Sequence, residues 1–190
     1  DGYLRNTLLD DGVNEESGGS GRGKLLWTPS DNLEIALNAS FDDHRDGAGA
    51  YVILDSDPFE TEQDVNGFSD LVSNAQGLRI AYTHPDFQFT SITSRRFSRN
   101  DLETDGDYSA LDAAVRVIDE VSNTVFSQEL RLQSPEVAEK FEWIVGGYYE
   151  SSQVNSEGNG LRFGNDVNTL FGPTFLPPGS LSLANSEANS

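Results

Sequence analysis

The sequence predicts an all-β protein whose antiparallel strands form a segment of a transmembrane β-barrel. Apolar and polar residues alternate with a period of two along several segments, as in strands with two unlike faces. Short and long connections alternate strictly, as do the short periplasmic turns and long extracellular loops of such barrels. The apolar face is expected to carry no charged side chain, with Gln128 as its one strongly polar member.

Composition excludes several classes of protein. The chain has 190 residues and a formal net charge of −20, which argues against nucleic acid as a partner and against docking to an anionic membrane surface by charge. There is no cysteine, so disulfides and thiolate metal sites are excluded. No run of about 18 apolar residues exists, so no transmembrane helix is predicted.

The first predicted strand pair covers residues 22–28 and 33–41, joined by a tight turn at 29–32. Its second strand has the clearest alternation in the chain. The polar face contains Glu34, Asn38 and Ser40, and the apolar face contains Leu33, Ile35, Leu37, Ala39 and Phe41.

The second predicted pair covers residues 77–83 and 87–97, joined by a turn at 84–86. Leu78, Ile80 and Tyr82 share the apolar face of its first strand. The alternation falters around Ser91 and Ile92, which indicates a β-bulge there.

The third predicted pair covers residues 126–133 and 141–150, with residues 133–140 as the connection. Direct cross-strand partners must share a face. This condition is met by setting Leu132 opposite Phe141, which also sets Arg131 opposite Glu142 as an ion pair. The same register sets Leu130 opposite Trp143 and Gln128 opposite Val145 on the apolar face.

Three irregular stretches separate these pairs: residues 47–74, 98–123 and 153–190. They are predicted to be long loops of roughly 25 residues or more, far above the usual loop length of about 4–6 residues. Residues 109–120 of the second stretch are predicted to form a short helix. The predicted strands have about 9–11 residues, enough for a tilted bilayer crossing.

Aromatic residues cluster beside the short turns, where an aromatic girdle at a membrane interface belongs. They are Trp27, Tyr82, Phe87, Phe141 and Trp143. The alternative is a soluble, secreted β-sandwich binding module, such as an adhesin or a glycan-binding domain, whose strands alternate in the same way.

The segment DLETDGDYSALD is a candidate calcium loop. Acidic residues and a glycine fall near the ligand and turn positions of an EF-hand loop: Asp101, Glu103, Asp105, Gly106, Asp107 and Asp112. Glu103 and Asp112 depart from the usual residue types, and no helix is predicted before the loop. The alternative is an acidic, solvated loop, in which case the chain has no cofactor. Asp42, Asp43, His44 and Asp46 are a weaker candidate, with a polar strand end as the alternative.

No catalytic motif is present, so the chain is predicted not to be an enzyme. It lacks a nucleophile elbow, a phosphate-binding glycine loop and a zinc-protease motif. Paired carboxylates that could serve a glycosidase are expected by chance in so acidic a chain.

Several segments resemble mid-barrel strands of TonB-dependent outer-membrane receptors. The most specific is the hairpin FSQELRLQSP with FEWIVGGYYE; DGYLRNT and GRGKLLWTPSDNLEIALNASFDDHRD are also similar. The resemblance covers the strands, about half of the chain, and gives no match for the loops.

The resemblance implies a 22-stranded barrel, of which residues 1–190 supply about seven strands. An N-terminal plug domain and the last barrel strands are expected outside this chain. The implied function is active uptake of a scarce small molecule across the cell outer membrane, such as a ferric siderophore, cobalamin, haem or a glycan. The implied partners are outer-membrane lipid and, through the plug, the TonB energy-transducing complex. No ligand-binding residue carries over.

Overall fold

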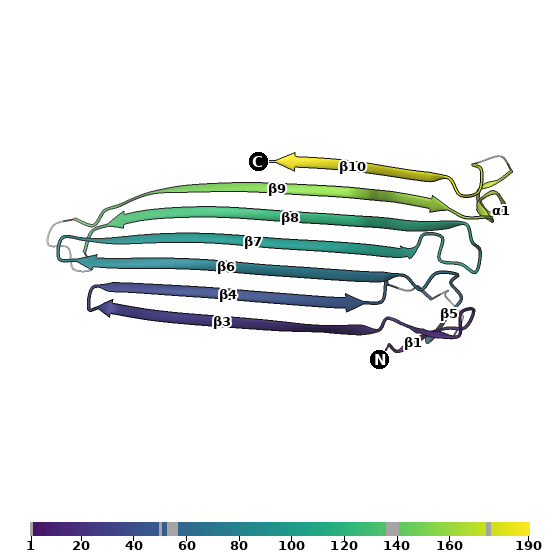
Figure 1. Cartoon of the computed structure of the whole chain (residues 1–190), viewed down its shortest axis with the longest axis horizontal. Helices are drawn as coiled ribbons and strands as arrows, with labels where there is room; N and C mark the ends of the chain where they lie inside the picture. Colours follow the sequence, from purple (N-terminus) through teal and green to yellow (C-terminus); the bar gives the residue numbers. More distant parts are fainter. Residues whose placement is uncertain (1, 50, 53–56, 136–140, 174–175) are drawn as a thin grey trace.

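A computed structural model describes residues 2–49, 51–52, 57–135, 141–173 and 176–190, without the side chains of residues 116–119. Its main feature is a seven-stranded antiparallel sheet with the order β10-β9-β8-β7-β6-β4-β3, so neighbours in this sheet follow one another along the chain (Figure 1). The strands are β3 (Glu16–Ser30), β4 (Leu33–Asp46), β6 (Phe68–His84), β7 (Phe87–Asp105), β8 (Ala114–Gln133), β9 (Ile144–Phe163) and β10 (Leu181–Asn189). The all-β, antiparallel prediction is therefore confirmed.

A second, small sheet lies at one end of the large one, on the right in Figure 1. It contains β1 (Leu4–Asn6), β2 (Asp11–Val13) and β5 (Glu60–Thr61) in the order β2-β1-β5. The helix α1 (Val167–Phe171) lies at the same end. We refer to this end as the loop end and to the opposite end as the turn end.

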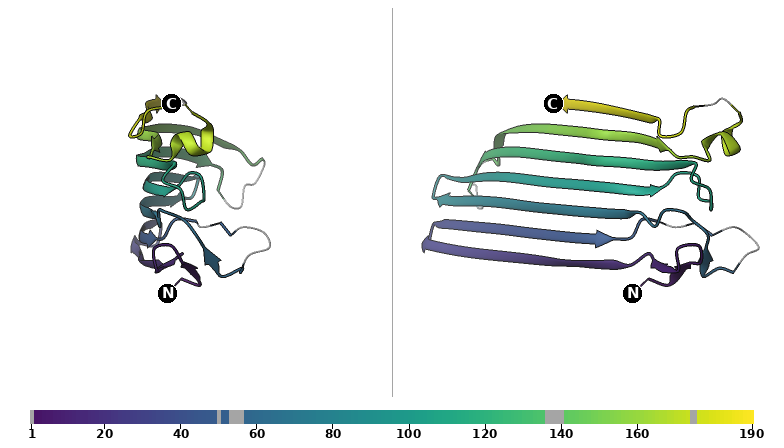
Figure 2. Two further views of the ribbon diagram at one scale, coloured as in Figure 1. Left: turned by 90° about the vertical axis from the view of Figure 1, so that its right-hand side faces the viewer. Right: turned by 45° about the vertical axis from the view of Figure 1, so that its right-hand side comes forward.

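The large sheet is a single layer (Figure 2). Every extensive contact between its strands links hydrogen-bonded neighbours. Most of the buried apolar residues lie at the loop end, namely Leu4, Val13, Ala48, Ala113, Ala114, Val115, Phe163 and Val167. No second layer covers either face of the sheet within the described residues.

The strict alternation of short and long connections predicted from the sequence holds only in part, because the 106–113 connection at the loop end is shorter than the 134–143 connection at the turn end. Residues 31–32, 85–86 and 134–143 connect strands at the turn end, and residues 47–67, 106–113 and 164–180 connect them at the loop end. The loop-end connections are shorter than predicted because the strands are longer. Six strands of the large sheet have 14–20 residues, against the predicted 9–11. At about 3.3 Å per residue, β8 spans about 65 Å, so it continues well past a bilayer core of about 30 Å.

Three further predictions of local structure are wrong. The predicted helix at 109–120 is absent, because residues from Ala114 onwards belong to β8 and pair with β7 and β9. The pairing of β6 with β7 is continuous through Ser91 and Ile92, and the irregularity lies between Asn100 and Leu102. The last segment, predicted to be loop, contains the edge strand β10.

The predicted register of the third strand pair is also wrong. Leu132 lies opposite Val145, and Leu130 lies opposite Gly147, so the partner of Leu132 is residue 145 in place of residue 141. Ser134 and Trp143 close the ladder, since the Ser134 N–H donates to Trp143 O at 2.8 Å. Arg131 pairs with Glu129 on its own strand and not with Glu142.

Candidate functional site

One face of the large sheet carries an apolar band at the turn end. The registers of neighbouring strands bring the predicted apolar faces to the same side: Leu37 lies opposite Leu25 and Leu78, and Ile35 lies opposite Trp27 and Ile80. We call this set the apolar band. Its members are Leu25, Trp27, Leu33, Ile35, Leu37, Ala39, Phe41, Leu78, Ile80, Tyr82, Phe87, Phe89, Phe126, Leu130, Leu132, Val145 and Tyr149.

The length of the apolar band along the strands can be compared with the apolar height of outer-membrane barrels. Along β4 it runs from Leu33 to Phe41, which is roughly 26 Å of strand. A strand tilted by about 40° would cover about 20 Å of the membrane normal, close to the apolar band of about 25 Å on outer-membrane barrels. Beyond it the same face turns polar, because Asp43, Arg45 and Asp70 follow on β4 and β6.

The polar side chains inside the band satisfy one another. Thr93 Oγ1 donates to Gln128 Oε1 at 2.6 Å, and Gln128 Nε2 donates to Ser91 Oγ at 3.0 Å. An unsatisfied polar group is costly in an apolar environment, so this network makes Gln128 compatible with the band.

Arg95 departs from the predicted absence of charge on this face. Because β7 has no bulge at Ser91, Arg95 shares a face with Phe89 and lies opposite Gln76 and Phe126. Its guanidinium donates to Asn74 Oδ1 at 3.4 Å and lies 5.9 Å from the centre of the Phe97 ring. Arg95 therefore marks the limit of the apolar band towards the loop end on the central strands.

The opposite face of the sheet is mostly polar and has many small side chains, although Leu26, Ile92, Ile144 and Tyr148 also lie on it. Arg79 forms an ion pair with Glu34, and Ser94 and Ser127 share a hydrogen bond of 2.7 Å. The alternate positions include Ala36, Ser40, Ala75, Gly77 and Ala81. This is the face that the period-two pattern predicts to be polar.

The predicted aromatic girdle lies at the turn end. Tyr82 and Phe87 flank the 85–86 turn with ring centres 6.2 Å apart, and His84 stacks on Phe87 at 4.8 Å. Trp27 is 59% exposed and Phe141 is 71% exposed. Trp27 and Phe141 are therefore free to contact the surroundings of the turn end.

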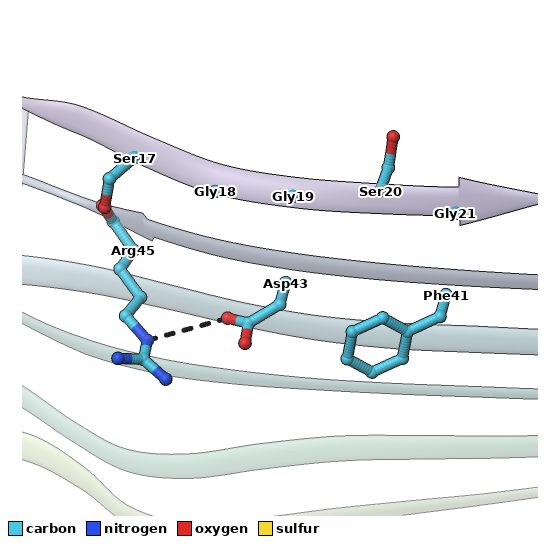
Figure 3. A pocket seen from close by; sticks show the side chains of 8 residues that line it. All are labelled: Ser17, Gly18, Gly19, Ser20, Gly21, Phe41, Asp43 and Arg45. Carbon is cyan, nitrogen blue, oxygen red and sulfur yellow. Dashed lines mark hydrogen bonds and ion pairs between the residues drawn. The ribbon is translucent and has the colours of Figure 1, made fainter.

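The weaker metal candidate at 42–46 does not form a cluster. Asp43 and Arg45 lie on the same side of β4 as the apolar band, while Asp42, His44 and Asp46 lie on the other, and none of these residues belongs to a group of three or more side chains that could hold a metal ion within the described residues. Figure 3 shows Arg45 reaching Asp43, an ion pair of 3.6 Å, beside a shallow groove. The groove exists because Gly19 and Gly21 of β3 present no side chain opposite Asp43 and Phe41.

The candidate calcium residues are divided between two places. Asp101 and Glu103 lie within β7 and form ion pairs with Arg99 and Arg162, at 3.4 and 3.5 Å. Asp105, Asp107 and Asp112 lie together at the loop end, where they accept hydrogen bonds from neighbouring backbone N–H groups.

The sequence analysis did not identify Asp64, which the fold brings to this group. Asp64 lies between β5 and β6, and burial, with the nearby charges of Asp105, Asp107 and Asp112, raises its pKa to about 6. Burial also raises the pKa of Asp105. No pattern in the sequence links residue 64 to residues 105–112, because the contact is tertiary.

No metal site is evident in this group. Among the described residues, no set of three or more His, Asp or Glu side chains is arranged to hold a metal ion. The structure therefore identifies none of Asp101, Glu103, Asp105, Asp107 and Asp112 as a metal ligand, and calcium binding stays a prediction.

The comparisons with family models and solved structures do not assign this chain to a family. No protein-family model matches the sequence, and no solved structure matches the fold significantly. No helix in the described parts of the chain is long and apolar enough to cross a membrane.

Proposed function

We propose that this chain is a segment of the wall of an outer-membrane β-barrel that acts as a TonB-dependent active-transport receptor. The observation that carries the proposal is the apolar band on one face of a single-layer sheet, with a polar face behind it. Lipid would cover the band, and the polar face would line the barrel interior. In the proposed protein a plug domain and further strands lie outside residues 1–190.

The exposure of the band supports a partner that covers it. Leu37 is 45% exposed, Leu130 is 46% exposed and Leu25 is 62% exposed. Burying one Leu, Ile, Val or Phe side chain fully is worth about 1.5–3 kcal/mol. The apolar band contains many such side chains, so covering it would be strongly favourable. A sheet left with this face in water would associate or aggregate.

A soluble β-sandwich binding module is the second candidate, and it needs a second sheet over the same band. The described residues supply none, since the small sheet lies at the loop end of the large one. The aromatic residues at the turn end also favour lipid, because Trp and Tyr are enriched where a membrane meets water.

The two ends of the sheet suggest an orientation. The turn end would face the periplasm, and the acidic loop end would face the outside of the cell. A scarce nutrient such as a ferric siderophore is the proposed substrate. This part of the proposal rests on the resemblance of the strands to receptor barrels and on the polar, small-residue face that would border a transport path.

Labelling of single cysteines tests orientation and location together. The 190 residues contain no cysteine, so Asp57→Cys at the loop end and Asp31→Cys at the turn end can be introduced as a matched pair of exposed acidic positions. In intact cells producing the full-length protein with no other cysteine, a membrane-impermeant maleimide is expected to label Asp57→Cys. Asp31→Cys is expected to react only after the outer membrane is permeabilised.

The transport step is tested in the same cells. Deleting the full-length gene is expected to abolish TonB-dependent uptake of one member of a substrate panel containing ferric siderophores, cobalamin, haem and glycans. Recovery of the protein in the soluble fraction, or equal labelling of both cysteines in intact cells, would contradict the membrane proposal. A membrane protein whose deletion leaves all uptake unchanged would contradict the receptor proposal alone.

A further inference from the structure

Cations gather on the polar face of the large sheet, although the chain as a whole is strongly acidic. From the turn end as far as Ser40 on β4, the strands present five cationic side chains and three carboxylates on this face. The cations are Arg22, Lys24, Arg79, Arg96 and Arg131, and the carboxylates are Glu34, Glu129 and Glu150. This part of the face therefore has an excess of positive charge, whereas the formal net charge of the chain is −20.

Three of these cations are unpaired. Arg79 and Arg131 are neutralised by ion pairs with glutamates. The other three are exposed and form no ion pair within the described residues, namely Arg22, Lys24 and Arg96. An unpaired guanidinium group is well suited to carboxylate and phosphate groups, which it can bind with two parallel hydrogen bonds.

The register of the strands places the two unpaired arginines in one row across the sheet. Arg22 of β3 lies opposite Ser40 of β4. Ser40 lies opposite Ala75 of β6, and Ala75 lies opposite Arg96 of β7. Three inter-strand steps separate the arginines, which is about 14 Å between their Cα atoms. Because the two side chains between them are small, both guanidinium groups can contact one ligand that lies over Ser40 and Ala75.

A hollow of about 260 Å³ lies on this face beside Arg96. Its polar lining consists of partly exposed side chains, namely Ser40, Ser73, Ser98 and Asn123. Asn123 Oδ1 accepts a hydrogen bond from Ser152 Oγ at 3.5 Å, and the amide N–H groups of Asn123 have no partner within the described residues. Hydroxyl and amide donors beside a guanidinium group are suited to an anionic oxygen.

The neighbouring carboxylates of this face lie outside the row of the two arginines. Asp42 lies one row towards the loop end and accepts a hydrogen bond from Ser73 Oγ at 3.5 Å. Glu150 lies one row towards the turn end and accepts a hydrogen bond from Tyr148 on its own strand. These two carboxylates therefore limit the site on both sides and do not occupy it.

The acidic loop end is too distant to oppose an anion at this site. Asp105, at the end of β7, lies roughly 30 Å of strand beyond Arg96. The Debye length in physiological salt is about 8 Å, so salt screens the charge of the loop end before it reaches the row of arginines.

We propose that Arg22, Lys24 and Arg96 form a binding site for an anionic small molecule that has at least two carboxylate or phosphate groups. One group binds Arg96 at the hollow, and a second binds Arg22 and Lys24. The inference rests on the proposed function, in which this face borders the transport path. It narrows the substrate from a scarce small molecule of any charge to an anionic one.

Cysteines on the floor of the site can measure its electrostatic potential. In the full-length protein without other cysteines, refolded in detergent micelles, Ala75→Cys is reacted with an anionic and a cationic methanethiosulfonate. Ala81→Cys is the matched control, because Ala81 is on the same face of β6 and lies opposite Glu34, which Arg79 neutralises. The ratio of the anionic to the cationic rate is expected to be about tenfold higher at residue 75, since two unpaired arginines attract an anion and repel a cation.

Citrate, a small tricarboxylate, tests whether the site can be occupied. At constant ionic strength, citrate is expected to slow the reaction of Ala75→Cys with an uncharged thiol reagent several-fold, while glucose has no effect. Replacing both arginines, Arg22→Gln with Arg96→Gln, is expected to remove the rate preference and the protection. Arg95→Gln is the control for the loss of a cation, because Arg95 lies next to Arg96 on the opposite face, and it should leave both results unchanged.

Equal rate ratios at residues 75 and 81, or citrate protection that persists without the two arginines, would overturn the anion site. A cysteine at residue 75 that reacts with none of the reagents would also overturn it, because protein would then fill this face. If the variant without both arginines does not fold, the comparison of residues 75 and 81 remains decisive.

The uptake panel gives an independent result. The member whose uptake is lost on gene deletion is expected to have carboxylate or phosphate groups, and an uncharged member would overturn the anion site. The labelling of Asp31→Cys and Asp57→Cys does not depend on the arginines. Failure of the anion site and failure of the membrane proposal are therefore distinguishable.

Discussion

Replacing Leu37 with arginine is expected to destabilise the full-length barrel in a bilayer by about 2–4 kcal/mol, the cost of a cationic side chain at the membrane midplane on the lipid face. Leu37 lies in the middle of the apolar band between Leu25 and Leu78, so its side chain has no polar surface to reach without crossing the band. Leu130→Arg is expected to have an effect of the same order.

The matched control is Asn38→Arg, one residue along β4 and on the polar face. Its cost is expected to be small, since an interior-facing arginine stays in contact with water or polar groups. The measurement is the free energy of unfolding of the refolded barrel in lipid vesicles, obtained by denaturant titration. Equal stabilities for Leu37→Arg, Leu130→Arg and the unmodified protein would contradict the assignment of the band to lipid.

The isolated chain of residues 1–190 is expected not to form a stable monomer in detergent-free buffer. Two causes act together. The sheet leaves β3 and β10 as open edges, and such edges pair with other chains. The apolar band also has no cover within the described residues, so association is the easiest way to remove it from water.

Sedimentation and thermal melting of this fragment, with and without detergent micelles, provide the measurement. Large or heterogeneous species without detergent are expected. A monomer with a sharp, cooperative melt would contradict the barrel account and favour the soluble module.

The faces of the strands could be predicted from the sequence, but their pairing register could not. Period two assigns Leu130 and Leu132 to one face and Arg131 to the other in any register shifted by an even number of residues. The predicted and observed partners of Leu132, residues 141 and 145, therefore satisfy the pattern equally. In the observed register a Cβ at Gly146 would lie 2.7 Å from Leu130 O, so the close approach at this point needs a glycine.

Strand length and the acidic group were missed for related reasons. Alternation is visible only where one face is apolar, so the polar outer halves of β7, β8 and β9 were predicted to be loops, although their backbone pairing continues. Asp64 and the 105–112 segment are far apart in the sequence, and only the three-dimensional fold brings them together, where the Asp64 N–H donates to Ser109 O.

The central claim, that the apolar band faces lipid, is tested most directly by spin labels on single-cysteine variants of the full-length protein in vesicles. Labels at residues 37 and 130 belong to the band, and labels at residues 38 and 129 are their neighbours on the polar face. The account predicts that 37 and 130 are more accessible to lipid-soluble oxygen, while 38 and 129 are more accessible to a water-soluble nickel chelate. Greater accessibility of 37 and 130 to the nickel chelate, or no alternation along β4 and β8, would contradict it.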